Sequence, residues 1–255
     1  MRRFSFTKTF SAVAALSALS LSLALCLRSA QERQPHWTYN DPQQWGNLDP
    51  EYSACSLGRT QSPIDIQNAR PARLPVLKIN YQRVPLNIID NGHTIQVNYP
   101  VGSTLSIGGN VYSLKQFHFH HPAEEEIEGQ RFPLVAHFVH VDAESHLVVI
   151  AVLFEPGAAN PALDTLWQNI PASKDREELL PSVAIQAADL FPPERGYFTF
   201  AGSLTTPPCA EGVTWYVLRD HPTVSEQQIA AFAKIYPMNA RPIQPANGRR
   251  ILQSK

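Results

Sequence analysis

Residues 111–120 read Val-Tyr-Ser-Leu-Lys-Gln-Phe-His-Phe-His, and residues 134–140 read Leu-Val-Ala-His-Phe-Val-His. Both runs lack glycine and proline and are rich in β-branched and aromatic residues, which predicts two strands. Because strand side chains alternate between two faces, His118 and His120 point to the same side. A third imidazole, from His137 in the second run, would complete a set of three nitrogens with a fourth position open. That arrangement is typical of a catalytic zinc rather than a structural one.

Three histidines alone do not decide the nature of the site. A His-x-His pair also occurs in cupin-type barrels that hold iron or manganese, metals that imidazole ligands also suit. The chain has nine histidines, so a chance cluster of core or surface histidines is the plainer alternative. The pattern leaves both alternatives open.

The rest of the chain predicts a mostly β protein with a single domain. Of its 255 residues 44% are hydrophobic, which is enough to bury a substantial core. The 22 prolines divide the sequence into short elements. Strands are expected at 64–67, 76–81, 86–90, 94–99, 104–107, 111–120, 134–141, 146–155, 196–201 and 212–219.

Helices are expected to be few and peripheral. Residues 161–169 and 176–180 are short candidates. The clearest candidate is 225–236, where apolar residues fall at helical spacing and where Thr223 and Glu226 fit a capping box. Many strands with few peripheral helices predict a central sheet, and the histidine runs put a metal site on one face of it.

The N-terminus has the pattern of a secretory leader. Basic residues precede an apolar, acid-free stretch at about 10–27, and a polar segment follows at 31–34. We therefore expect residues 1–30 to be a signal peptide and residues 31–255 to be the domain. A membrane anchor is the alternative, because the stretch approaches the ~18 apolar residues of a spanning helix. Its serines and alanines, and its position, favour the leader.

The charge balance argues against a nucleic-acid partner. Removing the four basic residues of the leader leaves 17 Lys and Arg against 22 Asp and Glu, a net charge of −5. No basic patch is evident. We therefore expect a soluble, periplasmic or secreted protein with no membrane span after the leader is removed. The sequence leaves the oligomeric state open, a dimer included.

Two cysteines, Cys55 and Cys209, lie well beyond the leader. In an exported protein an even number of cysteines predicts a disulfide. Two buried free thiols are the alternative.

Five motifs, in order, resemble those of the bacterial α-class carbonic anhydrases: QSPIDI at 61–66, NGH at 91–93, QFHFH at 116–120, AHFVH at 136–140 and GSLTTPP at 202–208. The likeness runs from residue 36 to residue 242, nearly the whole chain after the leader. Cys55 and Cys209 also match the disulfide pair of the bacterial members.

The resemblance implies a large, mainly antiparallel, twisted central sheet with short helices packed on its outside. Zn²⁺ would be held by His118, His120 and His137, with water in the open position. Zinc lowers the pKa of its bound water to about 7, and carbonic anhydrases are themselves the standard example of this effect. The resulting hydroxide would add to CO2, reversibly, to give bicarbonate and a proton. Hydrolysis of activated esters would be a side activity of the same site.

The resemblance also implies roles for the residues around the metal. Thr205 would accept a hydrogen bond from the zinc hydroxide, and Glu124 would accept the hydroxyl proton of Thr205. Spacing alone leaves Glu125 and Glu126 open for the second role. Gln116 would accept a hydrogen bond from the first metal ligand.

Substrate and proton sites follow from the same resemblance. Residues that would bind substrate beside the metal, most of them apolar and suited to a small nonpolar gas, are Val139, Val149, Leu204, Thr206, Val213 and Trp215. His93 would carry the product proton to bulk water, because imidazole titrates near neutral pH. The polar residues that would order the connecting waters are Tyr39, Asn91 and Gln96.

Three positions depart from the family pattern. Val135 stands where the family commonly has a Glu two residues before the third ligand. Glu125 and Phe200 stand in place of a His and a Tyr. We therefore expect an active enzyme with an altered network behind the metal. Either water or a backbone carbonyl replaces the lost acceptor, or zinc is held less firmly.

Overall fold

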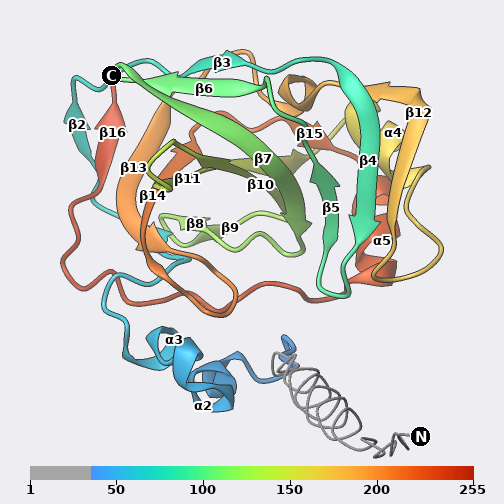
Figure 1. The fold of residues 1–255 in the computed structure, drawn as a ribbon. Coiled ribbons are helices and arrows are strands. Elements are labelled where there is room, and N and C mark those ends of the chain that lie inside the picture. Colours follow the sequence, from blue (N-terminus) through green and yellow to red (C-terminus); the bar gives the residue numbers. More distant parts are fainter. Residues whose placement is uncertain (1–35) are drawn as a thin grey trace, which may run out of the picture. The chain divides into compact units, whose positions relative to one another are not determined.

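A long, twisted sheet dominates the computed structural model, which describes residues 36–255 (Figure 1). Within these residues its 13 strands are β2 (Arg70–Ala72), β3 (Lys78–Asn80), β4 (Val84–Asp90), β5 (Ile95–Asn98), β6 (Thr104–Ile107), β7 (Asn110–His120), β10 (Leu134–Val141), β11 (Leu147–Pro156), β12 (Glu177–Ile185), β13 (Tyr197–Ser203), β14 (Glu211–Leu218), β15 (Thr223–Val224) and β16 (Leu252–Ser254). Ten follow the order β12-β4-β5-β7-β10-β11-β14-β13-β16-β2. The pairs are antiparallel from β12 to β11 and again between β14, β13 and β16.

The remaining elements are short. A small sheet is formed by β1 (Asp65–Ile66), β8 (Glu126–Ile127) and β9 (Gln130–Arg131). The helices of the described residues are η1 (Pro42–Gln44), α2 (Trp45–Leu48), η2 (Pro50–Tyr52), α3 (Ala54–Leu57), α4 (Pro161–Trp167), η3 (Ala187–Leu190) and α5 (Glu226–Ile235). Trp37–Lys255 forms one compact unit. The predicted fold class, mostly β with a mainly antiparallel sheet and short helices, is confirmed.

Three long strands, β7, β10 and β11, form the middle of the sheet and set the position of the histidines. β7 and β10 are antiparallel with His118 opposite His137, and β10 and β11 are antiparallel with Val139 opposite Val149. β11 is apolar and buried along most of its length, as expected of a strand covered on both faces. It pairs in parallel with β14, which brings Trp215 beside Val149.

The alternation along β7 separates two sides of the sheet. Phe117 and Phe119 belong to the larger of two hydrophobic clusters, which also includes residues of α4 and α5. The Phe119 ring lies 4.8 Å from that of Trp167 in α4 and 6.1 Å from that of Phe232 in α5, measured between ring centroids. The helices therefore cover the face opposite His118, so the histidine face is left for a cleft.

The helix predicted at 176–180 is wrong. This segment begins β12, which pairs antiparallel with β4 at the edge of the sheet. The Glu177 carboxylate accepts hydrogen bonds from the side-chain amides of Asn87 (2.7 Å) and Asn98 (2.8 Å). Pairing with β4 and these long-range bonds override a local preference that favoured a helix, as tertiary context commonly does.

The helix predicted at 225–236 is present as α5, but its capping residues differ from those predicted. Ser225 is the N-cap, and its hydroxyl and the side chain of Gln228 form the reciprocal hydrogen bonds of a capping box. Thr223 instead belongs to β15, where it pairs with Glu155 of β11.

The predicted disulfide is confirmed. Cys55 in α3 is bonded to Cys209, which follows the Thr-Thr-Pro-Pro segment and lies 154 positions further along the sequence. Among the helices of the described residues, none has the length and apolar character needed to cross a bilayer. The predicted leader, residues 1–30, lies outside the described residues.

Candidate metal centre

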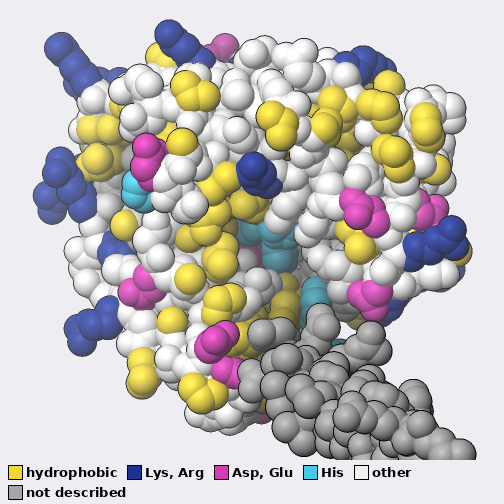
Figure 2. Space-filling model, viewed as in Figure 1, with side chains coloured by type: hydrophobic (Ala, Val, Ile, Leu, Met, Phe, Trp, Pro, Cys, Tyr) yellow, Lys and Arg dark blue, Asp and Glu magenta, His cyan; other side chains and the backbone are white. Residues whose placement is uncertain are grey.

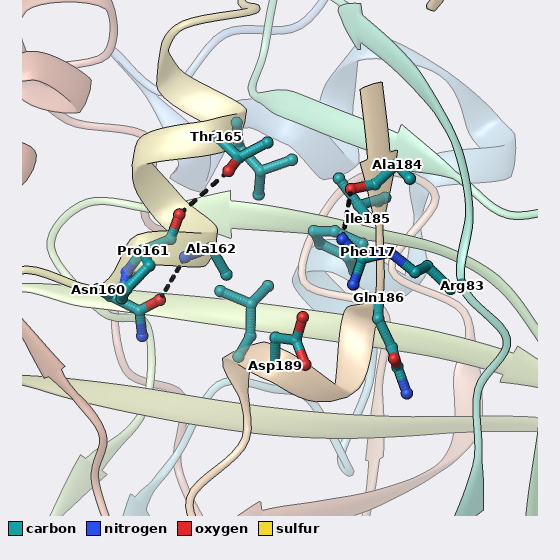
Figure 3. Close-up of a pocket in the computed structure, with 12 residues that line it drawn as sticks. Arg83, Phe117, Asn160, Pro161, Ala162, Thr165, Ala184, Ile185, Gln186 and Asp189 are labelled. Atoms are coloured by element: carbon teal, nitrogen blue, oxygen red, sulfur yellow. Dashed lines mark hydrogen bonds between the residues drawn. The ribbon is translucent and has the colours of Figure 1, made fainter. Parts of the chain in front are cut away.

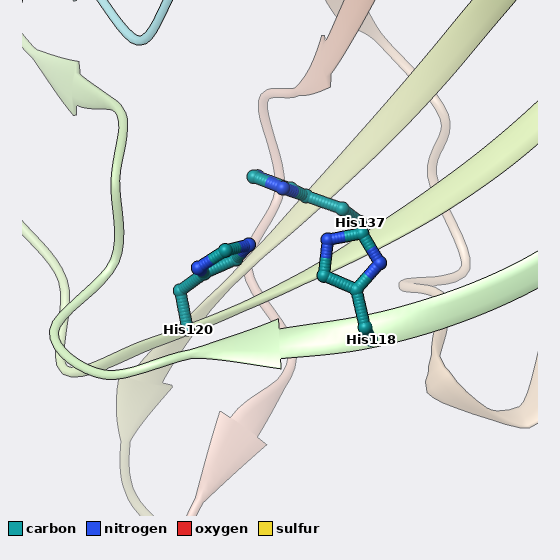
Figure 4. Close-up of side chains that lie close together, drawn as sticks. All are labelled: His118, His120 and His137. Carbon is teal, nitrogen blue, oxygen red and sulfur yellow. The ribbon is translucent and has the colours of Figure 1, made fainter. Parts of the chain in front are cut away.

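The three predicted metal ligands lie together on one face of the sheet. Figure 4 shows the rings of His118 and His120, from β7, and of His137, from β10, gathered around one point. One ring nitrogen from each lies within 4.8 Å of the other two. His120 and His137 are buried, each 1% exposed, and His118 is half-buried. Figure 2 shows histidine side chains at the floor of a hollow bordered by hydrophobic side chains.

Each imidazole uses its outer nitrogen for a hydrogen bond. Nδ1 of His118 lies 2.8 Å from the Gln116 side-chain oxygen, as predicted for Gln116, and Nδ1 of His120 lies 2.7 Å from the Asn239 carbonyl. Nε2 of His137 lies 3.1 Å from the Glu125 carboxylate. These acceptors assign the ring protons to the outer nitrogens. The nitrogens left for an ion are Nε2 of His118, Nε2 of His120 and Nδ1 of His137.

The inner nitrogens have the chemistry that a zinc ion needs. Nε2 of His120 is buried with no hydrogen-bond partner, which is costly unless a cation binds there. Burial lowers the pKa of His118 to about 3 and lowers the pKa of His120 well below its ordinary value, so both rings are neutral with a lone pair available. Burial also lowers the pKa of His137, but Glu125 and Glu124 outweigh it and raise the pKa overall. The residues therefore fit zinc.

Glu124, the residue predicted to accept from Thr205, lies beside the inner nitrogens of His120 and His137. Its carboxylate is 1% exposed and accepts a hydrogen bond from the backbone N–H of Arg241 at 2.7 Å. Burial raises the pKa of Glu124 to about 7, although the nearby Thr205 side chain acts to lower it. Its other oxygen lies 3.6 Å from Nε2 of His120. The structure thus brings Glu124 and Thr205 together beside the candidate ligands.

Sequence reasoning assigned no role to two residues that hold this arrangement. Asn239 accepts from His120 through its carbonyl, and its side-chain amide donates to the carbonyls of His93 (3.0 Å) and Phe119 (2.9 Å). The buried guanidinium of Arg241 donates to the Gln61 side chain at 2.9 Å and to backbone carbonyls. The only sequence signal was the family-like run at 239–242.

The predicted apolar wall lies on the same side as His137. The Trp215 ring is 4.9 Å from the His137 ring, between centroids, and its Nε1–H donates to the Ser203 carbonyl at 3.0 Å. Residues of the smaller hydrophobic cluster around it include the predicted Val139, Val149, Leu204 and Val213. Thr206 lies beside Thr205, and its carbonyl accepts from the N–H of Cys209 at 2.8 Å.

The predicted proton-transfer residues form a connected group. The Asn91 side chain accepts from the backbone N–H of His93 at 3.0 Å and lies 3.4 Å from the amide oxygen of Gln96. Gln96 is opposite His118 in the pairing of β5 with β7. The His93 ring stacks on Trp37, with centroids 3.7 Å apart and an interplanar angle of 7°. Sequence reasoning did not predict this contact with Trp37.

Tyr39 contacts the same region from the N-terminal segment. Its ring meets that of His120 edge-on, with centroids 6.5 Å apart. Burial, followed by the nearby Glu124 carboxylate, raises the pKa of its phenol well above the ordinary value. The hydroxyl therefore stays protonated and can order water near the histidines.

A separate cavity of about 460 Å³ lies on the other side of the sheet (Figure 3). Its lining includes Phe117, which points away from the face of His118, together with residues at the start of α4 and in η3. The lining contains apolar side chains such as Leu166 and two charged side chains of opposite sign, Arg83 and Asp189. None of the three candidate ligands lines this cavity.

Comparison with known proteins identifies the family. The family model for eukaryotic-type carbonic anhydrases matches residues 40–255. The chain belongs to this family. It is 47% identical to a carbonic anhydrase of Pectobacterium carotovorum over 241 residues, covering 92% of this chain and 98% of that protein. Its enzyme class is therefore that of the carbonic anhydrases, which interconvert CO2 and bicarbonate.

Solved carbonic anhydrase structures share the fold. A hyperthermostable carbonic anhydrase from a hydrothermal vent chimney matches with a TM-score of 0.83 and 42% identity, covering 86% of this chain and all of that one (100%). The α-carbonic anhydrase of Thermovibrio ammonificans, solved with the inhibitor sulfanilamide, matches with a TM-score of 0.82 and 38% identity, covering 87% and 99%.

In this carbonic anhydrase, two of the three positions that depart from the family pattern hold buried apolar side chains, and the third holds a buried carboxylate. Val135 is fully buried (0% exposed) in the smaller hydrophobic cluster. Phe200 lies in the same cluster, with its ring nearly parallel to that of Trp215 at 6.4 Å between centroids. The replacement acceptor predicted for His137, a water or a backbone carbonyl, is instead a side chain, that of Glu125.

Proposed function

We propose that this chain hydrates CO2 reversibly with Zn²⁺ held by His118, His120 and His137. The observation that carries the proposal is the approach of one nitrogen from each ring to within 4.8 Å of the other two, while the other nitrogen of each ring is engaged by an acceptor. When bound, zinc supplies a Lewis acid that makes water nucleophilic near neutral pH, the effect for which carbonic anhydrases are the standard example.

Thr205 and Glu124 orient the attacking water. The Thr205 hydroxyl has one proton, and we expect it to be donated to the nearby Glu124 carboxylate. Thr205 can then only accept a hydrogen bond from the nucleophilic oxygen, which directs a lone pair of that oxygen at the substrate. The bond from the Arg241 N–H to Glu124 fixes the carboxylate in place.

The apolar wall beside His137 suits a substrate with no net charge or dipole. Val139 and Val149 are adjacent across β10 and β11, and Trp215 is adjacent to Val149 across β11 and β14. CO2 needs no hydrogen bonds to leave water, so apolar side chains hold it at little cost in desolvation. Leu204, Val213 and Thr206 would complete the pocket.

Proton release uses the group around His93. This imidazole would receive the product proton through waters ordered by Tyr39, Asn91 and Gln96 and pass it to solvent. Its support is the position of Gln96 opposite His118, which links the turn that carries His93 to the candidate ligands.

We also propose that the enzyme acts in the periplasm or outside the cell. The bond between Cys55 and Cys209 supports an oxidising compartment, which agrees with the leader pattern at residues 1–30.

A metal-removal experiment tests the proposed function. Protein purified from the exported fraction should contain one zinc per chain and should lose CO2 hydration, followed by stopped flow, after dialysis against a chelator. Added Zn²⁺ should restore the activity, and sulfanilamide should inhibit it. Ester hydrolysis, as a side activity of the same site, should follow the same pattern. Full activity in zinc-free protein would contradict the proposal.

Two histidine variants provide the matched comparison. His137→Gln should abolish zinc retention and activity. His146→Gln should retain both, although His146 lies in a second cluster of possible ligands with Asp142 and Glu144. Its Nδ1 is 2.9 Å from the Asp142 carboxylate, and its side chain is exposed, unlike that of His137. Loss of zinc from His146→Gln would show that the metal binds at the second cluster, and it would contradict the proposal.

A further inference from the structure

The third histidine is held by a residue that the family pattern does not predict. Nε2 of His137 lies 3.1 Å from both carboxylate oxygens of Glu125, and the geometry of a hydrogen bond is met by Oε2. Glu125 is 0% exposed and His137 is 1% exposed. Among the described residues, no other hydrogen bond to the Glu125 carboxylate is found. A buried carboxylate with one partner is a strong constraint on that partner.

The strand that carries His137 has no acceptor of its own for this ring. Val135 and Val139 are the residues two positions away on the same face of β10, and neither side chain can accept a hydrogen bond. Val135 instead packs in the smaller hydrophobic cluster. The carboxylate must therefore come from another segment.

The turn after β7 supplies it. The N–H of Ala123 donates to the Phe132 carbonyl at 3.0 Å, and the N–H of Glu126 donates to the Ile64 carbonyl at 3.3 Å. These two anchors fix the backbone on either side of Glu124 and Glu125. Both carboxylates then face His137, with Glu124 lying 3.8 Å from Nδ1 and Glu125 lying 3.1 Å from Nε2.

We propose that Glu125 is the positioning residue of His137, and that it replaces the carboxylate which Val135 no longer supplies. This inference rests on the proposed zinc site. By accepting the Nε2–H, Glu125 selects the tautomer whose Nδ1 lone pair faces the ion, and it fixes the ring orientation. Relative to the family pattern, the carboxylate comes from the turn and not from the strand, and its role at the histidine is the same.

An exchange of the carboxylate between the two positions tests this inference. Glu125→Gln should weaken zinc binding by about 10- to 100-fold, the usual effect of losing such a partner. Zinc affinity is measured by competition with a chromogenic chelator, with no assay of activity. Adding Val135→Glu to that variant should restore most of the affinity, because the strand then supplies the carboxylate. Restored affinity is not expected if Glu125 only supports the fold.

Glu126→Gln is the matched control. Glu126 is the next acid in the chain and pairs at the surface with Arg131 at 2.7 Å, so the loss of its charge should leave zinc affinity unchanged. A Glu125→Gln variant that is folded by circular dichroism and binds zinc as tightly as the parent would overturn the proposal.

A measurement on the unaltered protein keeps the proposal testable if the variant does not fold. In zinc-loaded protein, ¹⁵N-imidazole NMR should show His137 protonated at Nε2 and His118 and His120 protonated at Nδ1. A His137 ring protonated at Nδ1 would overturn the proposal. Because chelator competition and NMR do not depend on turnover, failure of CO2 hydration alone would count against the proposed function and not against the role of Glu125.

Discussion

Glu124, Glu125 and Glu126 are consecutive in the chain but face three different partners. The first accepts from the Arg241 N–H, the second from His137, and the third pairs with Arg131 at the surface. A run of acids is often only a solvated turn. Here two of the three are buried because each has a hydrogen-bonding partner, which is the condition under which burial of a carboxylate is tolerated.

The Thr205 hydroxyl can be removed by a single substitution of similar shape. Thr205→Val keeps the shape of the side chain but removes the hydroxyl that we propose donates to Glu124. We expect kcat/KM for CO2 hydration to fall by about 10²-fold, the usual effect of misaligning a reacting group, while zinc content is unchanged. Stopped-flow kinetics with metal analysis checks both.

Thr165→Val is the control for that substitution. Thr165 lies on α4 and donates to the Pro161 carbonyl at 3.2 Å, and the helix covers the face opposite the histidines. Its kinetics should match those of the parent. Equal activity of the two variants would remove the orienting role of Thr205.

At the scale of elements, β10 carries titratable groups on both of its faces. His137 faces the metal site, whereas His140 is buried in the opposite core, where its Nε2 lies 2.6 Å from the Tyr81 hydroxyl. Its Nδ1 lies 3.3 Å from the Val148 carbonyl, which assigns the proton to Nδ1 and makes Nε2 the acceptor. Burial lowers the pKa of His140 to about 4.

This lowered pKa predicts a loss of stability in acid. Between pH 6.5 and 4 the unfolded chain binds a proton at His140 that the folded protein does not, so the free energy of unfolding decreases as the pH falls through this range. The shift from 6.5 to about 4 corresponds to ~3 kcal/mol at most. Denaturant unfolding of the parent and of His140→Gln, at matched zinc content, should give curves that converge as the pH falls. Curves that stay parallel would contradict the buried, neutral imidazole.

Elements were predictable where their signal is local and periodic. β7 and β10 follow from alternation within about ten residues, and so does the shared face of His118 and His120. β12 was missed because its strand state depends on pairing with β4. The contact between Glu125 and His137 was missed for a similar reason: it depends on the anchored path of the turn, for which no local pattern exists.

In the whole molecule, the sheet separates the larger core from the face that carries the histidines. The larger cluster and α4 and α5 lie on one side, and the histidines lie on the other, next to the smaller cluster. The loop with Thr205 and Thr206 is tied to the N-terminal segment by Cys55–Cys209, and Arg241 bonds to the Cys55 carbonyl at 2.9 Å. Fold class, disulfide and family were predictable because motifs spread over nearly the whole chain agree.

The disulfide should stabilise the whole domain. It closes a loop of 154 residues, for which the chain-entropy model gives ~5 kcal/mol, with 2–4 kcal/mol typical in practice. The double variant Cys55→Ser, Cys209→Ser should have a free energy of unfolding lower by about 2–4 kcal/mol. The zinc content of the folded fraction should stay the same. Equal stability of the two proteins in denaturant would show that the unfolded chain gains little freedom.

Anomalous diffraction at the zinc edge, from crystals of the purified enzyme, would locate the metal. We expect a single strong peak about 2.0–2.1 Å from Nε2 of His118, Nε2 of His120 and Nδ1 of His137. A peak at any other group of side chains, or a His137 ring that binds the ion through Nε2, would contradict this expectation.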